Sequence, residues 1–379
     1  MNQPSAIVIG AGIVGLATAR ALAIRGYNVK VFERNETQTG ASVRNFGMIW
    51  PVGQPGGTLF ERAMLSRSIW KNICDEAGIW HSETGSLHLA YHQDELNVLQ
   101  EYAEEGKAYR NCQMISAKQA VQRSHAVRPV ELKGALWSEA EMIVDARNTI
   151  RQVADYLSEK FNVEFFYNTA ISKIDHPKVY SGKKIWEADE VFVCSGPDFE
   201  TLYPEVFLEA NITKCKLQMM RLAPKAGSIP LGPSLCGGLS LIHYAGFKVA
   251  SSLFDLQKRY ELEMHEFIKW GIHVMVAQNG KGELVVGDSH EYGLAPDPFN
   301  KTVINRLVLD YLQRFSLFND HELSASWNGI YSKMTNGQTE FIAEPESGVT
   351  ILNGLGGAGM TLSFGLAENY ISNRNRNIT

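Results

Sequence analysis

The first 33 residues alternate between a buried-strand pattern and a helical pattern. The apolar run AIVIG, residues 6–10, predicts a strand that is buried on both faces. The segment IVGLATARALAIRG, residues 13–26, predicts a helix that ends at Gly26. The run NVKVFE, residues 28–33, predicts a second strand. A strand, a helix and a second strand in this order are typical of a parallel α/β domain.

Three later segments extend this pattern. VDARNTIRQVADYLSEK, residues 144–160, predicts an amphipathic helix, and NVEFFY, residues 162–167, predicts the strand after it. The apolar run within ADEVFVCSGP, residues 188–197, predicts a buried strand that ends in small residues. We expect these segments to return to the parallel sheet of the N-terminal domain.

A second group of segments predicts an antiparallel sheet. Residues 215–224, 271–278 and 283–293 are rich in strand-forming residues, and the turn NGKG joins the last two. Residues 300–315 predict a helix, because their apolar residues recur at helical spacing. This combination of strand and helix patterns indicates a second domain of the α+β class.

The composition of the 379-residue chain is that of a globular protein, with 45% hydrophobic and 20% charged residues. A net charge of -5 gives no reason to expect nucleic acid or an acidic membrane as partner. No apolar run approaches about 20 residues, so we expect no membrane span. The N-terminus shows no targeting pattern, and the five scattered cysteines indicate neither a disulfide framework nor a metal site. A cytoplasmic protein fits these features best; the number of subunits is left open.

The glycines after the first strand carry the most specific chemistry. Gly10, Gly12 and Gly15 have the spacing G-x-G-x-x-G, and Glu33 ends the second strand. In a dinucleotide site the first glycine permits a tight turn, the second admits a pyrophosphate, and the third lets the helix pack on the strand. The helix N-terminus faces the phosphates, and the acid accepts hydrogen bonds from a ribose. We therefore predict dinucleotide binding; a turn needed only for packing is the alternative.

Two further stretches favour FAD over a nicotinamide cofactor. TGASVRNFGMIWP, residues 39–51, is rich in small residues and interrupts the α/β alternation. GLGGAGMTLSFGLAENY, residues 354–370, is a second glycine-rich turn that opens a helix. Glycine turns near both ends of the chain suit a long cofactor that both ends contact. With the N-terminal fingerprint, these stretches resemble the D-amino-acid-oxidase-like family of FAD-dependent oxidoreductases, which includes glycine oxidase and monomeric sarcosine oxidase.

This resemblance spans the chain and implies a set of residues that bind FAD without a covalent bond. The glycine turn would hold the pyrophosphate, Glu33 and Arg34 the adenosine end, and the two later stretches the flavin. The backbone of Ile171 would contact the adenine. The implied cofactor-binding residues are Gly10, Ala11, Gly12, Ile13, Val14, Gly15, Glu33, Arg34, Ala41, Ser42, Arg44, Asn45, Phe46, Gly47, Met48, Ile171, Cys194, Ser195, Gly196, Gly354, Leu355, Gly356, Gly357, Ala358, Gly359 and Met360.

The same resemblance implies an α/β fold with two interleaved domains. An FAD-binding Rossmann-type (doubly wound) domain would comprise residues 1–80, 141–214 and 326–379. A substrate domain of the α+β class, built on an antiparallel sheet, would comprise residues 81–140 and 215–325. The chemistry implied is transfer of a hydride to the flavin from the carbon that bears an amine. Hydrolysis of the resulting imine would give an aldehyde or keto product, with dioxygen or an electron carrier as acceptor.

The stretch WNGIYSKMTNGQ, residues 327–338, departs from the family pattern. Taken alone it predicts a turn, which either lies at the surface or faces a ligand. Relatives of the glycine oxidase type have an arginine there that clamps the substrate carboxylate, and monomeric sarcosine oxidase has its flavin-linked cysteine. This chain has Tyr331 at that position, and it has Gly357 where glycine oxidase carries a further arginine. Lys333 is the residue we expect to hold an oxyanion in their place.

These departures favour an amine without an ordinary carboxylate. The segment GDSHEYG and the Trp-x-Gly-x-Tyr pattern resemble a branch of the family that is associated with phosphonate breakdown. The substrates implied are 2-aminoethylphosphonate and its N-methyl derivative. The candidate catalytic residues are Tyr331, Lys333, His290, His273 and Arg44.

Several of these candidates have alternatives. Arg44 suits a loop-bridging role as well as substrate binding, and a histidine such as His273 or His290 is often structural. His243 and Tyr244 are expected to close the pocket from above. Other activities also stay open: a flavin dehydrogenase of a hydroxy acid or glycerol 3-phosphate, an amino-acid oxidase, and a flavoprotein with a structural or RNA-modification role. An NAD dehydrogenase leaves the C-terminal glycine turn unexplained.

Overall fold

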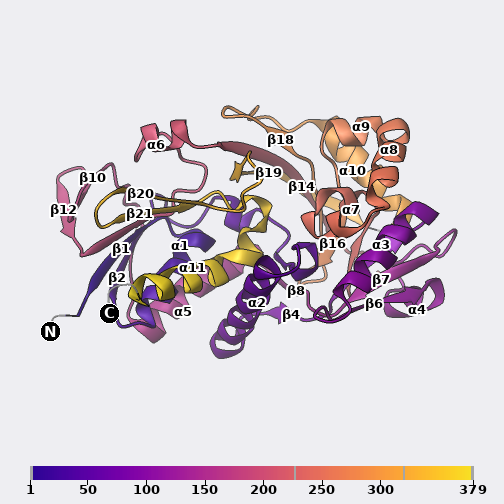
Figure 1. The fold of residues 1–379 in the computed structure, drawn as a ribbon, viewed down its shortest axis with the longest axis horizontal. Coiled ribbons are helices and arrows are strands. Elements are labelled where there is room, and N and C mark those ends of the chain that lie inside the picture. Colours follow the sequence, from indigo (N-terminus) through magenta and orange to yellow (C-terminus); the bar gives the residue numbers. More distant parts are fainter. Residues whose placement is uncertain (1–2, 226–227, 319–320, 377–379) are drawn as a thin grey trace.

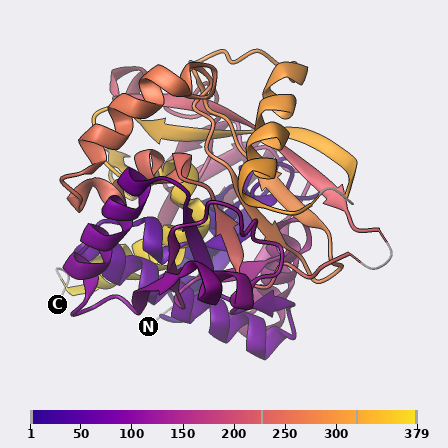
Figure 2. The same ribbon diagram turned by 90° about the vertical axis from the view of Figure 1, so that its right-hand side faces the viewer.

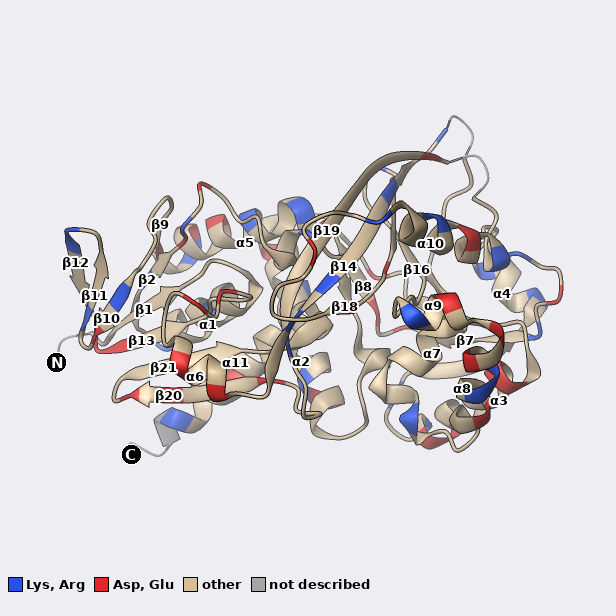
Figure 3. Cartoon of the chain, turned by 90° about the horizontal axis from the view of Figure 1, so that it is seen from above, with Lys and Arg blue, Asp and Glu red and all other residues tan. Residues whose placement is uncertain are grey.

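The computed structural model describes residues 3–225, 228–318 and 321–376, and the chain folds into an elongated molecule (Figure 1). Two sheets of different type dominate its two halves. The predicted domain ranges include residues 1–2, 226–227, 319–320 and 377–379, which lie outside the described residues. Acidic and basic positions are interspersed along both halves (Figure 3). In the described ranges, no helix is long and apolar enough to cross a membrane.

The first sheet has six strands, and its neighbours are parallel except at the β20 edge. Helix α1 (Ile13–Ala23) connects its two N-terminal strands, as the apolar pattern predicted. The order across the sheet is β20 (Phe341–Glu346), β21 (Val349–Asn353), β13 (Glu190–Val193), β1 (Ser5–Ile9), β2 (Asn28–Phe32) and β9 (Glu164–Phe166).

Alternate side chains of β1 enter two separate cores, because successive residues of a strand point to opposite faces. Ala6 and Val8 pack against helices α1, α2 (Thr58–Ala77), α5 (Ala146–Phe161) and α11 (Gly359–Arg376). Ile7 and Ile9 pack toward residues of a separate three-stranded antiparallel sheet. This sheet, with residues near α6 (Pro204–Glu209), occupies the face on which a doubly wound domain carries helices. Its strands are β10 (Lys173–Asp175), β11 (Lys178–Ser181) and β12 (Lys184–Glu187).

The second large sheet has nine strands and is antiparallel apart from the β15–β5 pair. Its strands are β18 (Glu291–Tyr292), β14 (Ile212–Ala223), β17 (Leu284–Gly287), β16 (Met275–Gln278), β15 (Ser234–Cys236), β5 (Ser86–Ala90), β7 (Gly134–Ser138) and β6 (Cys112–Ser116), with β19 (Glu322–Met334) paired to β14. This half of the molecule faces the viewer in Figure 2. Its helices are α3 (Gln93–Gly106), α4 (Ala117–Arg123), α7 (Leu239–His243), α8 (Leu253–Glu263), α9 (His265–Lys269) and α10 (Thr302–Phe315).

Among the described residues, a short fourth sheet and four 3-10 turns complete the fold. The sheet has β8 (Met142–Val144) between β3 (Met48–Ile49) and β4 (His81–Ser82). The turns are η1 (Ala41–Val43), η2 (Pro51–Gly53), η3 (Ala245–Val249) and η4 (Gly356–Ala358).

The long strands β14 and β19 run between the two halves (Figure 3). The prediction of a turn over residues 327–338 is wrong for its first part, because residues 327–334 belong to β19. The proposed domain limits at residues 214 and 325 fall inside β14 and β19, so both strands continue across them. These strands therefore carry residues from the large sheet toward the parallel sheet.

Candidate functional site

A cavity of about 670 Å³ lies at the carboxyl ends of the parallel strands and extends to the large sheet. Ile9, Phe32 and Cys194, at the ends of β1, β2 and β13, line one part of it. Met219 of β14 and Met275 of β16 line another part. Its volume falls within the range of about 300–1,000 Å³ that is usual for ligand sites. Ligands bind at this edge of parallel sheets, so the cavity is the candidate active site.

The N-terminal glycine turn has the tight geometry that its spacing predicted. Gly10 has a φ of +104°, and a Cβ there would lie 2.4 Å from the carbonyl oxygen of Cys194. A Cβ on Gly15 would lie 1.8 Å from the carbonyl oxygen of Gly10, so helix α1 can pack on the turn only with glycine there. Gly12 lines the cavity just before the helix begins, which leaves the helix N-terminus open to an anion.

The acid at the end of β2 is also placed at the cavity. Glu33 accepts hydrogen bonds from the backbone N–H groups of Ala11 (3.2 Å) and Asn35 (3.0 Å), which fix its carboxylate beside the glycine turn. Arg34 is exposed and forms an ion pair with Asp198. This arrangement suits recognition of a ribose hydroxyl by Glu33.

The stretch that follows β2 contributes small and apolar side chains to the cavity wall. The Ser42 hydroxyl accepts the backbone N–H of Ile13 at 2.9 Å, which ties this stretch to the start of α1. Asn45 donates to the carbonyl oxygens of Ala41 and Ser42 and thereby holds the loop closed. A Cβ on Gly47 would lie 1.9 Å from the carbonyl oxygen of Val144, so this glycine packs behind the wall.

Arg44 points away from the cavity. It is exposed, and its guanidinium donates to the backbone carbonyl of Asn328 at 3.0 Å. In return, the indole N–H of Trp327 donates to the backbone carbonyl of Arg44 at 3.1 Å. The structure therefore favours the bridging role for Arg44 over the substrate-binding role.

We expect Arg44→Ala to weaken the fold without changing substrate affinity. The substitution removes one hydrogen bond from a charged donor, which contributes about 1.5–3 kcal/mol when buried and less at this exposed site. Thermal unfolding of the holoenzyme should show a lower Tm, and steady-state kinetics should show an unchanged KM. A tenfold rise in KM would return Arg44 to the list of substrate-binding residues.

The second glycine-rich stretch forms the opposite wall. Residues 354–360 line the cavity, and α11 begins there at Gly359. A Cβ on Gly357 would lie 3.5 Å from the Tyr331 hydroxyl, and one on Gly356 would lie 3.5 Å from Cγ of Lys333. A second helix N-terminus thus opens onto the same cavity, where it favours negative charge on a ligand.

Tyr331 and Lys333 of β19 both line the cavity, because they are two residues apart on one face of the strand. Tyr331 is 9% exposed, and burial raises the pKa of its hydroxyl well above the usual value, so it is neutral. The Lys333 ammonium donates to the Tyr292 hydroxyl at 3.0 Å. The cysteine paired with Tyr331 across the strands is Cys215, whose pKa burial raises to about 12.

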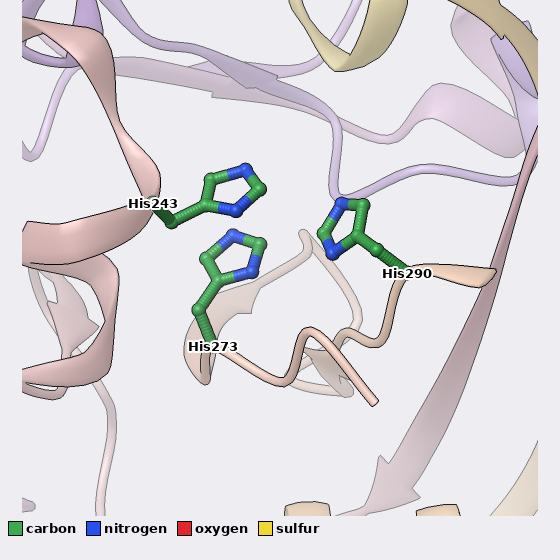
Figure 4. A group of neighbouring side chains, drawn as sticks. All are labelled: His243, His273 and His290. Atoms are coloured by element: carbon green, nitrogen blue, oxygen red, sulfur yellow. The ribbon is translucent and has the colours of Figure 1, made fainter. Parts of the chain in front are cut away.

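Three histidines gather at the end of the cavity near the large sheet (Figure 4). His243 ends α7, whereas His273 precedes β16 and His290 lies between β17 and β18, so the last two flank the strands on which the sequence placed them. The rings of His243 and His273 are stacked at 3.7 Å. Asp288 lies against them, with Oδ1 3.1 Å from Nδ1 of His273.

Burial sets the charge of this group. Burial lowers the pKa of His290 to about 4. The hydrogen bond to the Gly271 carbonyl raises this pKa, whereas the positive charge of Lys333 lowers it further. Burial also lowers the pKa of His243 and His273 and raises that of Asp288. The imidazoles are therefore neutral at pH 7.

Most sequence-predicted residues line this single cavity; Ala11, Gly15, Arg44 and Gly47 do not. Ala11, Gly15 and Gly47 still support the glycine turn or the wall behind it. Sequence reasoning missed Asp288, although its position between two strand segments and beside His290 was a signal. Other lining residues that were missed include Gln38, Thr39, Thr169, Ala170, Ser172 and Asp198.

The residues fit the expected FAD. Two helix N-termini and an acid near one of them meet one continuous cavity, and the glycines there leave the space that a Cβ would fill. The space between them suits a long cofactor with a central pyrophosphate.

Comparisons with known proteins agree with this arrangement. The family model described as DAO, FAD dependent oxidoreductase, matches residues 5–372. Over 378 aligned residues the chain is 23% identical to a polypeptide of the opine oxidase of Rhizobium meliloti, covering 93% of this chain and 91% of that protein.

Two solved structures have the same fold at low identity. Glycine oxidase from Geobacillus kaustophilus superposes with a TM-score of 0.77 and 18% identity, covering 97% of this chain and 93% of that one. L-proline dehydrogenase from P. horikoshii gives a TM-score of 0.79 with 19% identity, covering 99% and 94%. The expected mixed α/β fold is confirmed.

Proposed function

The chain belongs to the DAO family of FAD-dependent oxidoreductases, and we propose that it is an oxidase of a small primary or secondary amine. One observation carries the proposal: the cavity whose residues fit the dinucleotide continues to three histidines and Asp288. Of the described residues that line it, Arg34 is the only arginine, and it pairs with Asp198 near Glu33. The site therefore has, among those residues, no arginine free to clamp the carboxylate of an ordinary amino acid.

We further propose 2-aminoethylphosphonate or its N-methyl derivative as the substrate. Lys333 is the only lysine among the described lining residues. It lies beside Tyr331 toward the end of the cavity that holds the histidines, which is the proposed substrate end. A lysine ammonium is a compact point charge that suits a tetrahedral oxyanion. The neutral histidines at the same end suit the amine of such a substrate.

FAD held by the two glycine-rich turns would supply the acceptor for a hydride from the carbon that bears the amine. The amine nitrogen must be neutral at that moment, because an ammonium has no lone pair with which to form the imine. Lys333 would fix the anionic end, and the histidines would orient the nitrogen. Water then hydrolyses the imine, which gives phosphonoacetaldehyde from the proposed substrates. Dioxygen is the proposed final acceptor.

Anaerobic mixing of the oxidised holoenzyme with candidate amines tests the proposal. We expect the visible absorbance of the flavin to be bleached by 2-aminoethylphosphonate or its N-methyl derivative, with phosphonoacetaldehyde formed. Glycine, sarcosine and D-alanine should react much more slowly. Faster bleaching by any of these amino acids would contradict the aminophosphonate proposal and favour an amino-acid oxidase.

The same screen separates the other activities. Bleaching by glycerol 3-phosphate or a hydroxy acid, with every amine inert, would favour a flavin dehydrogenase acting on an alcohol. Oxygen consumption during turnover then distinguishes an oxidase from an enzyme that passes electrons to a carrier.

A further inference from the structure

His290 and the carboxyl group of Asp288 face each other at the end of the cavity near the large sheet. Nδ1 of His290 lies 2.9 Å from the carbonyl oxygen of Gly271, and a carbonyl only accepts, so this nitrogen carries the proton of the neutral ring. Nε2 of His290 therefore presents a lone pair. The carboxyl oxygen Oδ2 of Asp288 lies 3.9 Å from that nitrogen. Burial raises the pKa of this carboxyl, so a cation bound beside it favours its ionised form.

The neighbouring imidazoles add further lone pairs. His273 is 3% exposed, and neither of its ring nitrogens has a hydrogen-bond partner among the described residues. Its Nδ1 is close to Asp288, and its ring stacks on that of His243. Buried polar groups without partners are costly, so a ligand with N–H donors suits the lone pairs of this cluster.

A substrate ammonium supplies these donors. We propose that the ammonium binds between Asp288 and His290 and gives one proton to Nε2 of His290. In this step an N–H bond of the ammonium breaks, an N–H bond forms on Nε2, and the electron pair stays on the now neutral amine. The resulting imidazolium lies between the Gly271 carbonyl and the Asp288 carboxylate. This inference rests on the proposed oxidation of an amine and assigns the two residues that receive it.

The stacked rings argue against a metal ion in the cluster. A histidine nitrogen binds a metal in the plane of its ring, at about 2.0–2.1 Å for zinc. The ring centroids of His243 and His273 are 3.7 Å apart and the rings are within 6° of parallel, so an ion in the plane of one ring lies out of the plane of the other. An ammonium needs only the one lone pair of His290 and the carboxylate of Asp288.

The pH dependence of kcat/KM tests the inference. If the enzyme binds the ammonium, kcat/KM levels off between pH 6 and 8.5 once Asp288, whose pKa burial raises, has ionised, because the imidazoles are already neutral and the free substrate is still protonated. If it binds only the free amine, kcat/KM rises about tenfold per pH unit over that range. A rise of that slope would overturn the proposal. The titratable groups that contact the cluster or act on its charge are Asp288, Lys333, Tyr244, Tyr292, Tyr331 and Cys215.

Binding of half-substrates separates this inference from the proposed function. Ethylammonium and ethylphosphonate are titrated into the oxidised holoenzyme, and changes in the visible flavin spectrum report binding. We expect Asp288→Asn to weaken ethylammonium at least about tenfold and to leave ethylphosphonate unchanged, because only the first meets the carboxylate. His290→Gln should act similarly and serves if Asp288→Asn fails to load flavin. His265→Asn, at an exposed histidine of α9 outside the cavity, is the matched control.

Each outcome decides one of the two proposals. Ethylammonium binding that is unchanged in both variants would overturn the ammonium site, and so would a stoichiometric metal ion whose removal abolishes the binding. If no amine bleaches the flavin but ethylammonium still requires Asp288, the ammonium site stands and the proposed oxidation fails.

Discussion

Gly15→Ala is expected to yield a protein without bound flavin. The added Cβ would lie 1.8 Å from the carbonyl oxygen of Gly10, and both partners belong to backbone that cannot rotate away. Helix α1 must therefore shift from β1, which moves its N-terminus away from the pyrophosphate position. Overpacking of this kind costs about 1–3 kcal/mol, and we expect FAD affinity to fall roughly a hundredfold. The visible absorbance of the purified protein and its titration with FAD measure the effect.

Gly26→Ala is the matched control at the other end of the same helix. Gly26 has a φ of +83°, but nothing lies within 4 Å of a Cβ placed there. The substitution should lower stability by about 1 kcal/mol through its strained backbone, while flavin loading is retained. Equal flavin content in the Gly15→Ala and Gly26→Ala proteins would show that the close packing of α1 on the turn is not what positions the cofactor.

The N-terminal half of the cofactor site could be predicted because its determinants are local. The strand, the glycine turn, α1 and the next strand follow one another within the first 33 residues, so spacing alone places Gly10, Gly15 and Glu33 together. The C-terminal glycine turn could be assigned to the cofactor site only through the resemblance to a family, since no local signal indicates which cavity Gly356 and Gly357 line. The structure supplies that link through β19, whose Lys333 forms an isolated bridge with Leu355.

The strand character of residues 327–334 could not be predicted from local signals. The pair Asn328–Gly329 is typical of a tight turn, yet both residues form part of a long antiparallel ladder with β14. Gly329 pairs with Leu217, a residue far away in the sequence, and a Cβ on Gly329 would lie 3.3 Å from Cβ of Arg44. Close approach of another segment, not a turn, explains this glycine.

The histidine group shows the same limit. His243, His273 and His290 come from three separate segments, each of which contains a single histidine. Folding of the large sheet brings them together, with Asp288 from the bend after β17. Sequence reasoning named the histidines one by one, but the approach of Asp288 to His273 and His290 exists only in the folded chain.

Lys333→Met should selectively weaken the proposed aminophosphonate. Methionine keeps much of the length and apolar volume of lysine but removes the one ammonium that, among the described residues, lines the substrate end of the cavity. A hydrogen bond to a charged group contributes about 1.5–3 kcal/mol, so we expect KM for 2-aminoethylphosphonate to rise by about 10–150-fold. Ethylammonium has no anionic end, and the substitution removes a positive charge near it. Its binding should therefore not weaken. Steady-state kinetics and flavin titrations measure the two effects.

Lys184→Met is the control for this substitution, since Lys184 is exposed on β12 and does not line the cavity. Its kinetics should match those of the unsubstituted enzyme.

In the native arrangement the Lys333 ammonium donates a hydrogen bond to the Tyr292 hydroxyl at 3.0 Å. This neutral partner can be exchanged for an oxyanion without leaving a buried charge unpaired. Tyr292→Phe should therefore preserve most of the affinity that Lys333→Met removes. If Lys333→Met and Tyr292→Phe each weaken the binding of ethylammonium and of 2-aminoethylphosphonate equally, Lys333 supports the shape of the pocket. The anionic end of the substrate then binds elsewhere.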